Sequence, residues 1–328
     1  MRKFLAALLC SACSLTYVPH AAAWGNEGHQ TVGAIADQLI AGTHAAQEVS
    51  ALLKPGETLE SVSIWADCAK GYCGPLTDEM KEFVAANPKH HDYHFTDLPF
   101  QVNEYSDGAV GTTDHDVVQM LRQCIMVLRG DESPGSNPHG LSKRQALLLM
   151  THLAGDIHQP LHVGAAYLDT DNHFVVPASA AAIDEASIFS TQGDNFLLKG
   201  GGPLHGYWDS QAVRLAMTTV HATTPAAFAR ALIAQSSPVR PNQGDVTDWP
   251  AQWATETVLL SQRAHAGVRP LSRQMVQDRG GSSHNAWPVA TPKDYTTTAR
   301  EIAHDQLWAG GKRLAEVLET VWPENGRH

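Results

Sequence analysis

Two histidine–aspartate pairs in this chain have the spacing that a metal site on a helix requires. The stretch THLAGDIHQPLH places His152 and Asp156 four residues apart. On a helix, residues four apart lie on one face, one turn from each other. The same spacing recurs in LHGYWD, between His205 and Asp209. Imidazole nitrogens and carboxylate oxygens on adjacent turns favour a divalent transition metal, and zinc is the first expectation.

A single pair of this kind also occurs on helix surfaces as a hydrogen bond or a weak ion pair. The second copy of the spacing and two local features favour a metal. The apolar run Ala146–Met150 precedes His152, so this histidine is expected to be buried. Pro160 ends the helix and lets His162 turn back from the following segment.

Most of the segments that must position these residues have apolar residues at helical spacing, with breaks at glycine and proline. The apolar positions of Asp114–Arg129 recur at three- and four-residue steps, and Ser142 is expected to cap a helix over Lys143–Gln159. The further predicted helices are Asn26–Ile40, His44–Leu53, Leu59–Trp65, Asp78–Ala86, His205–Met217, Pro225–Gln235, Trp249–Ala264 and Thr296–Val321. The segment Ala165–Gln192 has no regular apolar face and is expected to be an exposed excursion. We therefore predict an all-α fold, as a single mainly helical domain.

The first 23 residues have the features of a secretory signal peptide. Arg2 and Lys3 precede the apolar run Phe4–Leu9, and small residues end the segment. The apolar run is too short to span a bilayer. The expected mature chain is 24–328, beginning at Trp24, in the periplasm or outside the cell.

The composition is acidic. The chain has 34 Asp and Glu against 23 Lys and Arg, a net charge of −11 with neutral histidines. Recognition of nucleic acid through an extended basic surface is therefore excluded, and a polyanion would need a local positive site. Bound metal ions would supply one, because they are the largest charges in their neighbourhood.

The cysteine spacing suits an oxidising compartment. Cys68 and Cys73 are five residues apart around Gly71, which fits a short-loop disulfide. A zinc-binding pair is the alternative, although there is no second cysteine pair to complete it. Cys124 lies in an apolar run and is expected to be a buried free thiol.

The histidines and acids of the chain suffice for more than one metal site. Nitrogen and oxygen ligands are offered by His29, Asp67, His94, His152, Asp156, His162, His205 and Asp209. Once a leader is removed, Trp24 would add a free α-amine and its own carbonyl oxygen. Such an amine titrates near roughly 7.7–8, so it can be neutral and bind a metal. Two closed zinc sites are possible, or three if the N-terminus takes part.

Five motifs stand in the order and spacing of a known family. They are WGNEGH from Trp24, WAD ending at Asp67, HFTD from His94, HLAGDIHQPLH from His152, and LHGYWD ending at Asp209. In these motifs the chain resembles the S1/P1 nucleases, bacterial type, which are relatives of zinc-dependent phospholipase C. The central motif is the most specific of the five. The resemblance implies a helical fold with three zinc ions in a cleft.

The resemblance also implies how the ligands divide among the three ions. Two of the ions would share the carboxylate of Asp156. The other ligands would be Asp67, His94 and His152 for the first ion, His29 with the amine and carbonyl of Trp24 for the third, and His162, His205 and Asp209 for the separate second ion. A hydroxide between the two bridged ions would be the nucleophile.

Three further residues take roles from the same resemblance. Lys70 stands where family members carry a basic residue that faces the phosphate, with a solvated surface lysine as the alternative. Asp97 is expected to orient a group or receive a proton, and to bind no metal. Asn195 corresponds to the asparagine of a Gly-Gly-Asn element that lines a base pocket, but Asp194 departs from that element. Base preference and substrate length are therefore open.

The resemblance implies a secreted zinc-dependent phosphodiesterase that cleaves single-stranded DNA and RNA to 5′-phosphorylated products, with 3′-nucleotidase activity. Nucleic acids and nucleotides would be its partners, and no stable protein partner is implied. One alternative is a phospholipase C that acts on phospholipid headgroups, but such enzymes end the second zinc site with glutamate where this chain has Asp209. Another is a secreted protein with structural zinc only, which the phosphate-facing role of Lys70 disfavours.

Overall fold

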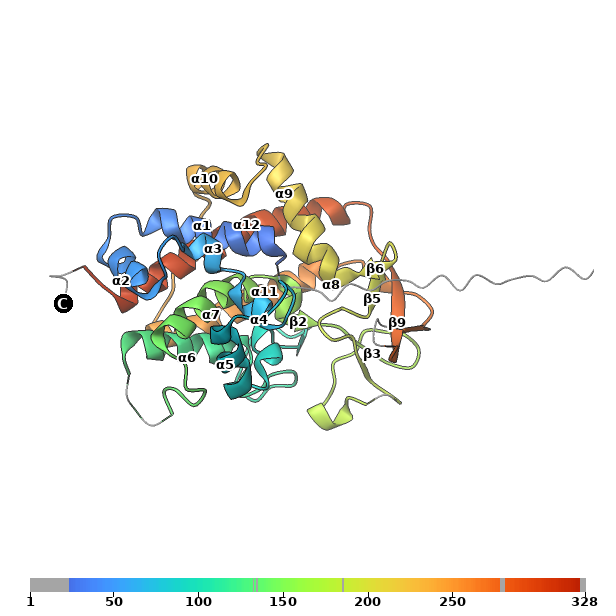
Figure 1. Ribbon diagram of the computed structural model, residues 1–328. Helices are drawn as coiled ribbons and strands as arrows, with labels where there is room; N and C mark the ends of the chain where they lie inside the picture. Colours follow the sequence, from blue (N-terminus) through green and yellow to red (C-terminus); the bar gives the residue numbers. More distant parts are fainter. Residues whose placement is uncertain (1–23, 132, 134, 185, 278–280, 325–328) are drawn as a thin grey trace, which may run out of the picture.

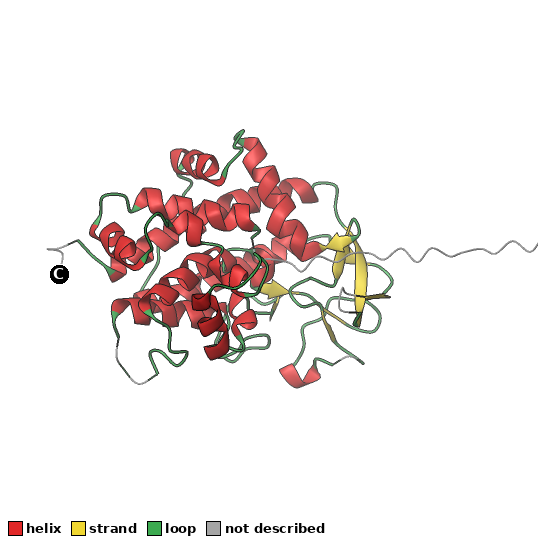
Figure 2. Cartoon of the chain, in the orientation of Figure 1, coloured by secondary structure: helices red, strands yellow, loops and turns green. Residues whose placement is uncertain are grey.

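The computed structural model describes residues 24–131, 133, 135–184, 186–277 and 281–324, so the predicted signal peptide lies outside the described residues (Figure 1). Helices make up most of the chain, and short strands gather at one end of the molecule, on the right in Figure 2. The prediction of a mainly helical fold is confirmed. The all-α description is wrong in detail, because the strands at that end form a small sheet.

The long helices agree with the sequence pattern to within a few residues. Their bounds are α1 (Asn26–Leu39), α2 (His44–Leu52), α5 (Asp78–Ala86), α6 (Val117–Arg129), α7 (Lys143–Asp156), α10 (Pro225–Gln235), α11 (Trp249–His265) and α12 (Tyr295–Val321). Two predicted helices are divided. Leu59–Trp65 becomes α3 (Leu59–Val62) and α4 (Trp65–Ala69), and His205–Met217 becomes α8 (Leu204–Gly206), the π-helical turn η4 (Tyr207–Ala212) and α9 (Val213–Thr219).

Helix α7 is the centre of the fold. Every residue from Ala146 to Asp156 is buried, so this part of the helix is packed against other elements on all sides. Ser142 caps its start in a capping box with Gln145, and Pro160 begins the next turn, η2 (Pro160–His162). The helix therefore holds the residues at its C-terminal end in a fixed place inside the protein.

Helices α1, α6 and α12 pack around α7, and α1 and α12 run side by side in Figure 1. The close approach of α12 to α7 and α1 depends on two glycines of α12. A Cβ on Gly310 would lie 3.1 Å from the carbonyl oxygen of Ala154, and one on Gly311 would lie 2.5 Å from the Cβ of Ile35. The small residues let α12 contact α7 and α1 at the same level, next to the end of α7.

The sheet stands beside the helical part. Its strand order is β6 (Gly202–Pro203), β5 (Leu197–Lys199), β9 (Ser283–Ala290) and β7 (Arg269–Pro270), and β8 (Gln274–Gln277) also pairs with β9. Strand β5 runs parallel to β9 with Leu197 opposite Trp287. The sheet thus joins a segment between two predicted metal ligands to a hairpin almost ninety residues later.

The predicted exposed excursion Ala165–Gln192 is exposed only in its middle. Strands β2 (Gly164–Ala165) and β3 (Tyr167–Leu168) are buried, and β4 (Phe189–Ser190) pairs with β3. Strand β2 runs parallel to β1 (Leu98–Pro99), which follows the HFTD motif. The ends of the excursion are therefore part of the packed structure.

Among the described residues, no helix is long and apolar enough to cross a membrane.

Candidate metal centre

Helix α7 brings the first two predicted ligands together. His152 and Asp156 are fully buried, and His152 Nε2 lies 3.2 Å from Asp156 Oδ2. The other ring nitrogen, Nδ1, lies 2.6 Å from the carbonyl oxygen of Ser63. Because a carbonyl only accepts, Nδ1 carries a hydrogen, and Nε2 is the nitrogen that faces the centre.

Two neighbouring segments add a histidine and a carboxylate. The short helix η1 (His90–His94) places His94 Nδ1 2.9 Å from Asp156 Oδ2 and 3.0 Å from His152 Nε2. Helix α4 places Asp67 Oδ1 3.8 Å from His152 Nε2 and 3.9 Å from His94 Nδ1. The four residues predicted for the first ion thus converge, although they come from three elements.

The N-terminal motif reaches the same place. His29 Nε2, on α1, lies 3.4 Å from Asp156 Oδ1, and the His29 ring stacks on that of His152 at 3.7 Å. Trp24 is fully buried. A Cβ on Gly155 would lie only 2.8 Å from His29 Nδ1, so the glycine lets the His29 ring approach α7, and Trp24 Cδ1 lies nearby at 3.7 Å from the same point.

The three remaining ligands form a second group. His162 Nε2 and His205 Nε2 are 3.0 Å apart, and His205 Nε2 lies 3.6 Å from Asp209 Oδ2. The Nδ1 atoms face carbonyl oxygens, that of His94 for His162 at 2.8 Å and that of Gly193 for His205 at 2.5 Å. Both rings therefore present Nε2 to the group.

The side chain of Gln159 completes the second group. Its amide donates to Asp209 Oδ1 at 2.8 Å, and its carbonyl oxygen accepts from the backbone N–H of Leu161. This leaves Asp209 Oδ2 free to face the two histidines. The backbone N–H of Gly25 donates to the carbonyl oxygen of Asp209 at 2.7 Å, so the start of the described chain is fixed beside this group.

In the part of the chain that the structure describes, three sets of side chains have ligand atoms within 4.8 Å of one another. They are His29 with Asp67 and His152, His94 with His152 and Asp156, and His162 with His205 and Asp209. The third set is the one predicted for the separate ion. The first two overlap around α7, where the resemblance implies two ions.

Several buried polar atoms of these sets lack a hydrogen-bond partner among the described residues. They are both ring nitrogens of His29, Asp156 Oδ1 and Asp209 Oδ2. Leaving such groups unpaired costs roughly 1–3 kcal/mol each. Cations would satisfy the two carboxylate oxygens and one nitrogen of His29, and imidazole with carboxylate oxygen is a donor set that zinc prefers. The residues present therefore fit the metal ions that the sequence implies.

Burial dominates the electrostatics of the centre. Burial, reinforced by neighbouring cationic groups, holds the pKa values of His29 and His94 well below the ordinary range, so both rings are neutral, the form that binds metal. Burial raises the pKa of Asp156 to about 6 and that of Asp209 well above its ordinary value. Carboxylates so poorly solvated ionise readily only beside a cation.

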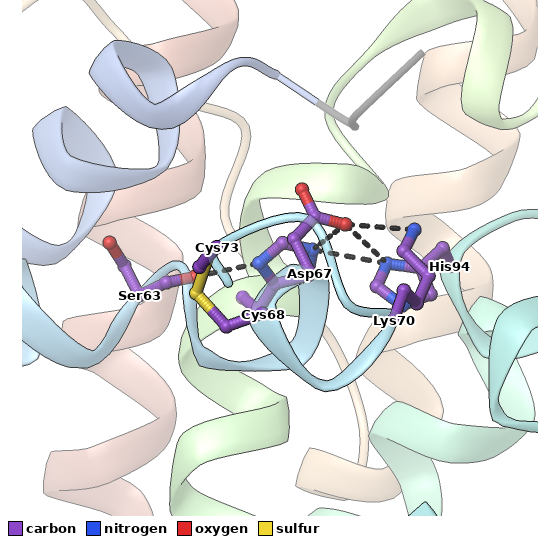
Figure 3. The surroundings of a disulfide bond; sticks show 7 residues. Ser63, Asp67, Cys68, Lys70, Cys73 and His94 are labelled. Atoms are coloured by element: carbon purple, nitrogen blue, oxygen red, sulfur yellow. Dashed lines mark hydrogen bonds and ion pairs between the residues drawn. A yellow bond between two sulfur atoms is a disulfide. The ribbon is translucent and has the colours of Figure 1, made fainter. Parts of the chain in front are cut away.

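Lys70 lies in the loop that a disulfide closes after Asp67. Cys68 and Cys73 form the predicted disulfide, which excludes the zinc-pair alternative, and Cys124 is the predicted buried thiol. Lys70 Nζ lies 2.8 Å from Asp67 Oδ1, and only 7% of its side chain is exposed, unlike a solvated surface lysine. Figure 3 shows Lys70, Asp67 and His94 converging beside the disulfide. A buried positive charge thus lies at the edge of the centre.

Asp97 is a half-buried carboxyl group close to the strand β1. Its Oδ1 atom has no hydrogen-bond partner among the described residues. Burial, with the charges of Asp194 and Asp92, raises its pKa to about 7. Its backbone is fixed, because its carbonyl accepts from the hydroxyl of Tyr167 at 2.7 Å and its N–H donates to the carbonyl of Gly111 at 2.9 Å.

The Gly193–Asp194–Asn195 element lies against the second group of ligands. Asn195 is half-buried, and its side-chain amide donates to the carbonyl oxygen of Gln192 at 2.8 Å. Asp194 is fully buried and lies 2.6 Å from Nε2 of His265. Sequence reasoning missed His265, because the two residues are 71 apart and no local pattern joins them.

Comparisons with known proteins agree with the motifs. Residues 24–323 match the family model described as S1/P1 Nuclease. The chain is 23% identical to Endonuclease 4 of Arabidopsis thaliana over 307 residues, which cover 93% of this chain and 91% of that protein. It is 28% identical to Endonuclease 2 of Arabidopsis thaliana over 150 residues and 27% identical to Nuclease S1 of Aspergillus oryzae over 157 residues. These two alignments cover 45% and 46% of this chain and 48% of each relative.

Proposed function

This chain belongs to the S1/P1 nuclease family, enzymes that hydrolyse nucleic acids, and we propose that it is a secreted zinc-dependent nuclease. Its substrates are single-stranded DNA and RNA, which it cleaves to 5′-phosphorylated products, and it also acts as a 3′-nucleotidase. The observation that carries the proposal is the convergence of buried histidines and aspartates from distant motifs around Asp156 and beside it.

Three zinc ions fit these residues. Asp156 would hold two of them, one with Asp67, His94 and His152 and the other with His29 and the amine and carbonyl of Trp24. His162, His205 and Asp209 would hold the remaining ion. Zinc supplies a water whose pKa is lowered towards roughly 7 and positive charge that offsets the phosphate. This charge would allow an acidic protein to bind a polyanion.

Three further side chains would assist the reaction or the binding of substrate. Lys70, buried next to Asp67, is a positive group that can hold a phosphate oxygen. Asp67 remains able to bind a metal, because a carboxylate has several lone pairs and the lysine uses only one of them. Asp97, with a pKa of about 7, can give or take a proton near neutral pH. Asn195 would contact a base next to the outer ligands.

Secretion is part of the proposal. The Cys68–Cys73 disulfide persists in oxidising compartments. Removal of residues 1–23 would free the amine of Trp24, which is buried beside His29. Export and metal binding would then be coupled, since an amide nitrogen in the uncleaved chain cannot act as the amine does.

The test uses the mature protein, beginning at Trp24, with its disulfide intact. It is assayed on single-stranded DNA, RNA, a 3′-nucleotide and phosphatidylcholine, before and after a chelator, and again after zinc is restored. We expect hydrolysis of the first three substrates, loss with the chelator and recovery with zinc. Cleavage of phosphatidylcholine without cleavage of any nucleic acid would support the phospholipase alternative and overturn the proposal.

A further inference from the structure

The turn that precedes the outer ligand helix has an unusual backbone. Gln192, Gly193 and Asp194 follow one another with φ angles of 52°, 58° and 66°. L-residues enter this left-handed region at a cost, and normally as single residues. Two of the three residues here carry a side chain. Such a turn persists only where the surrounding structure holds it, and strained backbone of this kind is concentrated at functional sites.

The carboxylate of Asp194 holds the turn. Its Oδ1 atom accepts from the backbone N–H of Ala166 at 3.0 Å and from the hydroxyl of Thr191 at 2.9 Å. Its Oδ2 atom lies 2.6 Å from His265 Nε2. Both oxygens are thus used within the protein, and the side chain is fully buried, so Asp194 does not face a substrate.

His265 supports this carboxylate from the end of α11. Its Nδ1 atom lies 2.8 Å from the carbonyl oxygen of Ser261, and its ring stacks on Phe100 at 3.9 Å with nearly parallel planes. Both ring nitrogens of His265 face acceptor oxygens, so the ring is held at both ends. The position and orientation of Asp194 are therefore fixed by a helix far from it in sequence.

The turn positions His205, which is one of the residues predicted to hold the separate metal ion. The carbonyl oxygen of Gly193 lies 2.5 Å from His205 Nδ1, and the carbonyl oxygen of Asp194 is 3.4 Å from the backbone N–H of His205. A Cβ on Gly193 would lie 3.3 Å from His205 Nδ1 and 3.1 Å from the carbonyl oxygen of Leu161. The turn therefore sets the direction in which His205 Nε2 points.

We infer that Asp194 and His265 form a positioning pair for the outer metal site. They hold the left-handed turn, the turn holds His205, and His205 presents Nε2 to His162 and Asp209. Neither residue contacts the ion or the substrate. The inference rests on the proposed function in one respect, that the outer ligands bind a metal ion.

The test compares Asp194→Asn and His265→Gln with the unchanged mature protein in zinc buffers. Bound zinc ions are counted by native mass spectrometry as the free zinc concentration falls. Loss of a group that orients a metal ligand commonly weakens metal binding 10–100-fold. We expect each variant to lose one zinc ion at about 10–100-fold higher free zinc, and to keep the other two as the unchanged protein does.

Asp116→Asn is the matched control. Asp116 is also a buried aspartate, and it caps α6 and accepts from Tyr105, with no outer ligand among its partners. This control is expected to lower the unfolding temperature without changing the zinc titration. Activity gives a second readout, since excess zinc should restore kcat in Asp194→Asn, whereas zinc should leave the control unchanged.

Three contrary results would have different meanings. If the unchanged protein binds zinc at three sites and both variants titrate as it does, the positioning pair is wrong while the proposed function stands. If the unchanged protein binds no zinc, the proposed function itself fails. Equal weakening of all three ions in Asp194→Asn would also overturn the inference, because the pair would then support the whole fold and not the outer site.

Discussion

The inner cluster and the outer cluster are built from different kinds of backbone. The inner cluster comprises Trp24, His29, Asp67, His94, His152 and Asp156, and the outer cluster comprises His162, His205 and Asp209. Most residues of the inner cluster lie on helices α1, α4 and α7, which the core holds on several sides. The residues of the outer cluster lie on the single turn η2 and on the stretch α8–η4, where the helix widens into a π-helical turn.

The two clusters also differ in what orients them. The inner cluster has two carboxylates with a buried lysine beside them. The outer cluster has one carboxylate, oriented by Gln159, and a histidine oriented by the turn at Gly193. Rigid helices preorganise the inner site, whereas the outer site depends on single hydrogen bonds from neighbouring segments. The outer ion should therefore be the more sensitive to changes in residues that bind no metal.

The largest effect is expected for Asp156→Asn. This change removes the carboxylate that both inner ions would share, so the mature protein should lose two zinc ions and all measurable nuclease activity. The outer cluster should keep its ion, because none of its three ligands is changed. Metal content by plasma mass spectrometry checks this result. Three zinc ions per chain in the variant would contradict the shared carboxylate.

The next effect concerns the N-terminus. Addition of Gly-Ser ahead of Trp24 turns its amine into an amide, which is a poor metal ligand. We expect the extended protein to hold one zinc ion less and to lose at least about 90% of its activity, with the outer ion unaffected. A Trp24→Phe variant with a free amine is the control, since it keeps the backbone ligands. Equal zinc content and rate in the extended and mature proteins would refute this role.

A smaller effect is expected from the disulfide, which adjoins only the inner cluster. Cys68→Ser with Cys73→Ser opens a short loop, for which the loss of stability is about 2 kcal/mol. The loop carries Lys70, so kcat should fall more than zinc content. Urea unfolding and a steady-state assay measure the two effects. A variant with unchanged kcat would show that Lys70 keeps its place without the disulfide.

The smallest effect is expected at the start of α7, far from both clusters. Arg144 donates hydrogen bonds to Glu57 and Glu79. Burial alone would raise the pKa values of these two carboxyl groups, but hydrogen bonds from Arg144 and Lys54 lower them below the ordinary value. In the unfolded chain these glutamates have the ordinary pKa of 4.5. The stabilisation that their ion pairs give to the folded state is therefore present above about pH 4.5, and it is lost as the pH falls through their lower pKa values in the folded state.

Arg144→Gln should therefore lower the free energy of unfolding by about 1 kcal/mol at pH 7 and by little at pH 3. Urea unfolding at the two pH values gives the comparison, with Lys81→Gln as the control, because Lys81 forms an exposed ion pair. An equal deficit at both pH values would mean that Arg144 acts through packing. Metal content and activity should not change in either variant.

Helical spacing made one pair of the inner cluster predictable, whereas the other members of this cluster were expected only from the resemblance to the family. The pair His152–Asp156 lies on one face of α7 as its spacing requires, and Ser142 caps this helix as predicted. The end was predicted three residues late, because Asp156, and not Gln159, is the last residue of the helix. Local sequence carries this information, since capping and periodicity depend on neighbours within about one turn.

The outer region was less predictable for a physical reason. Strand β9 reads SHNAWPVA, without apolar alternation, and it pairs with β5 from a distant part of the chain. The Asp194–His265 pair likewise joins residues 71 positions apart. Tertiary contacts of this kind leave no periodic trace in a single sequence. The buried β2 and β3 strands were missed because each has two residues, too few to show a pattern.

The most direct test is a crystal structure of the mature protein with anomalous scattering recorded on both sides of the zinc absorption edge. We expect three zinc peaks, two that share Asp156 and one held by His162, His205 and Asp209. A single peak, or an ordered outer cluster with no ion in a crystal grown with excess zinc, would contradict the assignment of three ions.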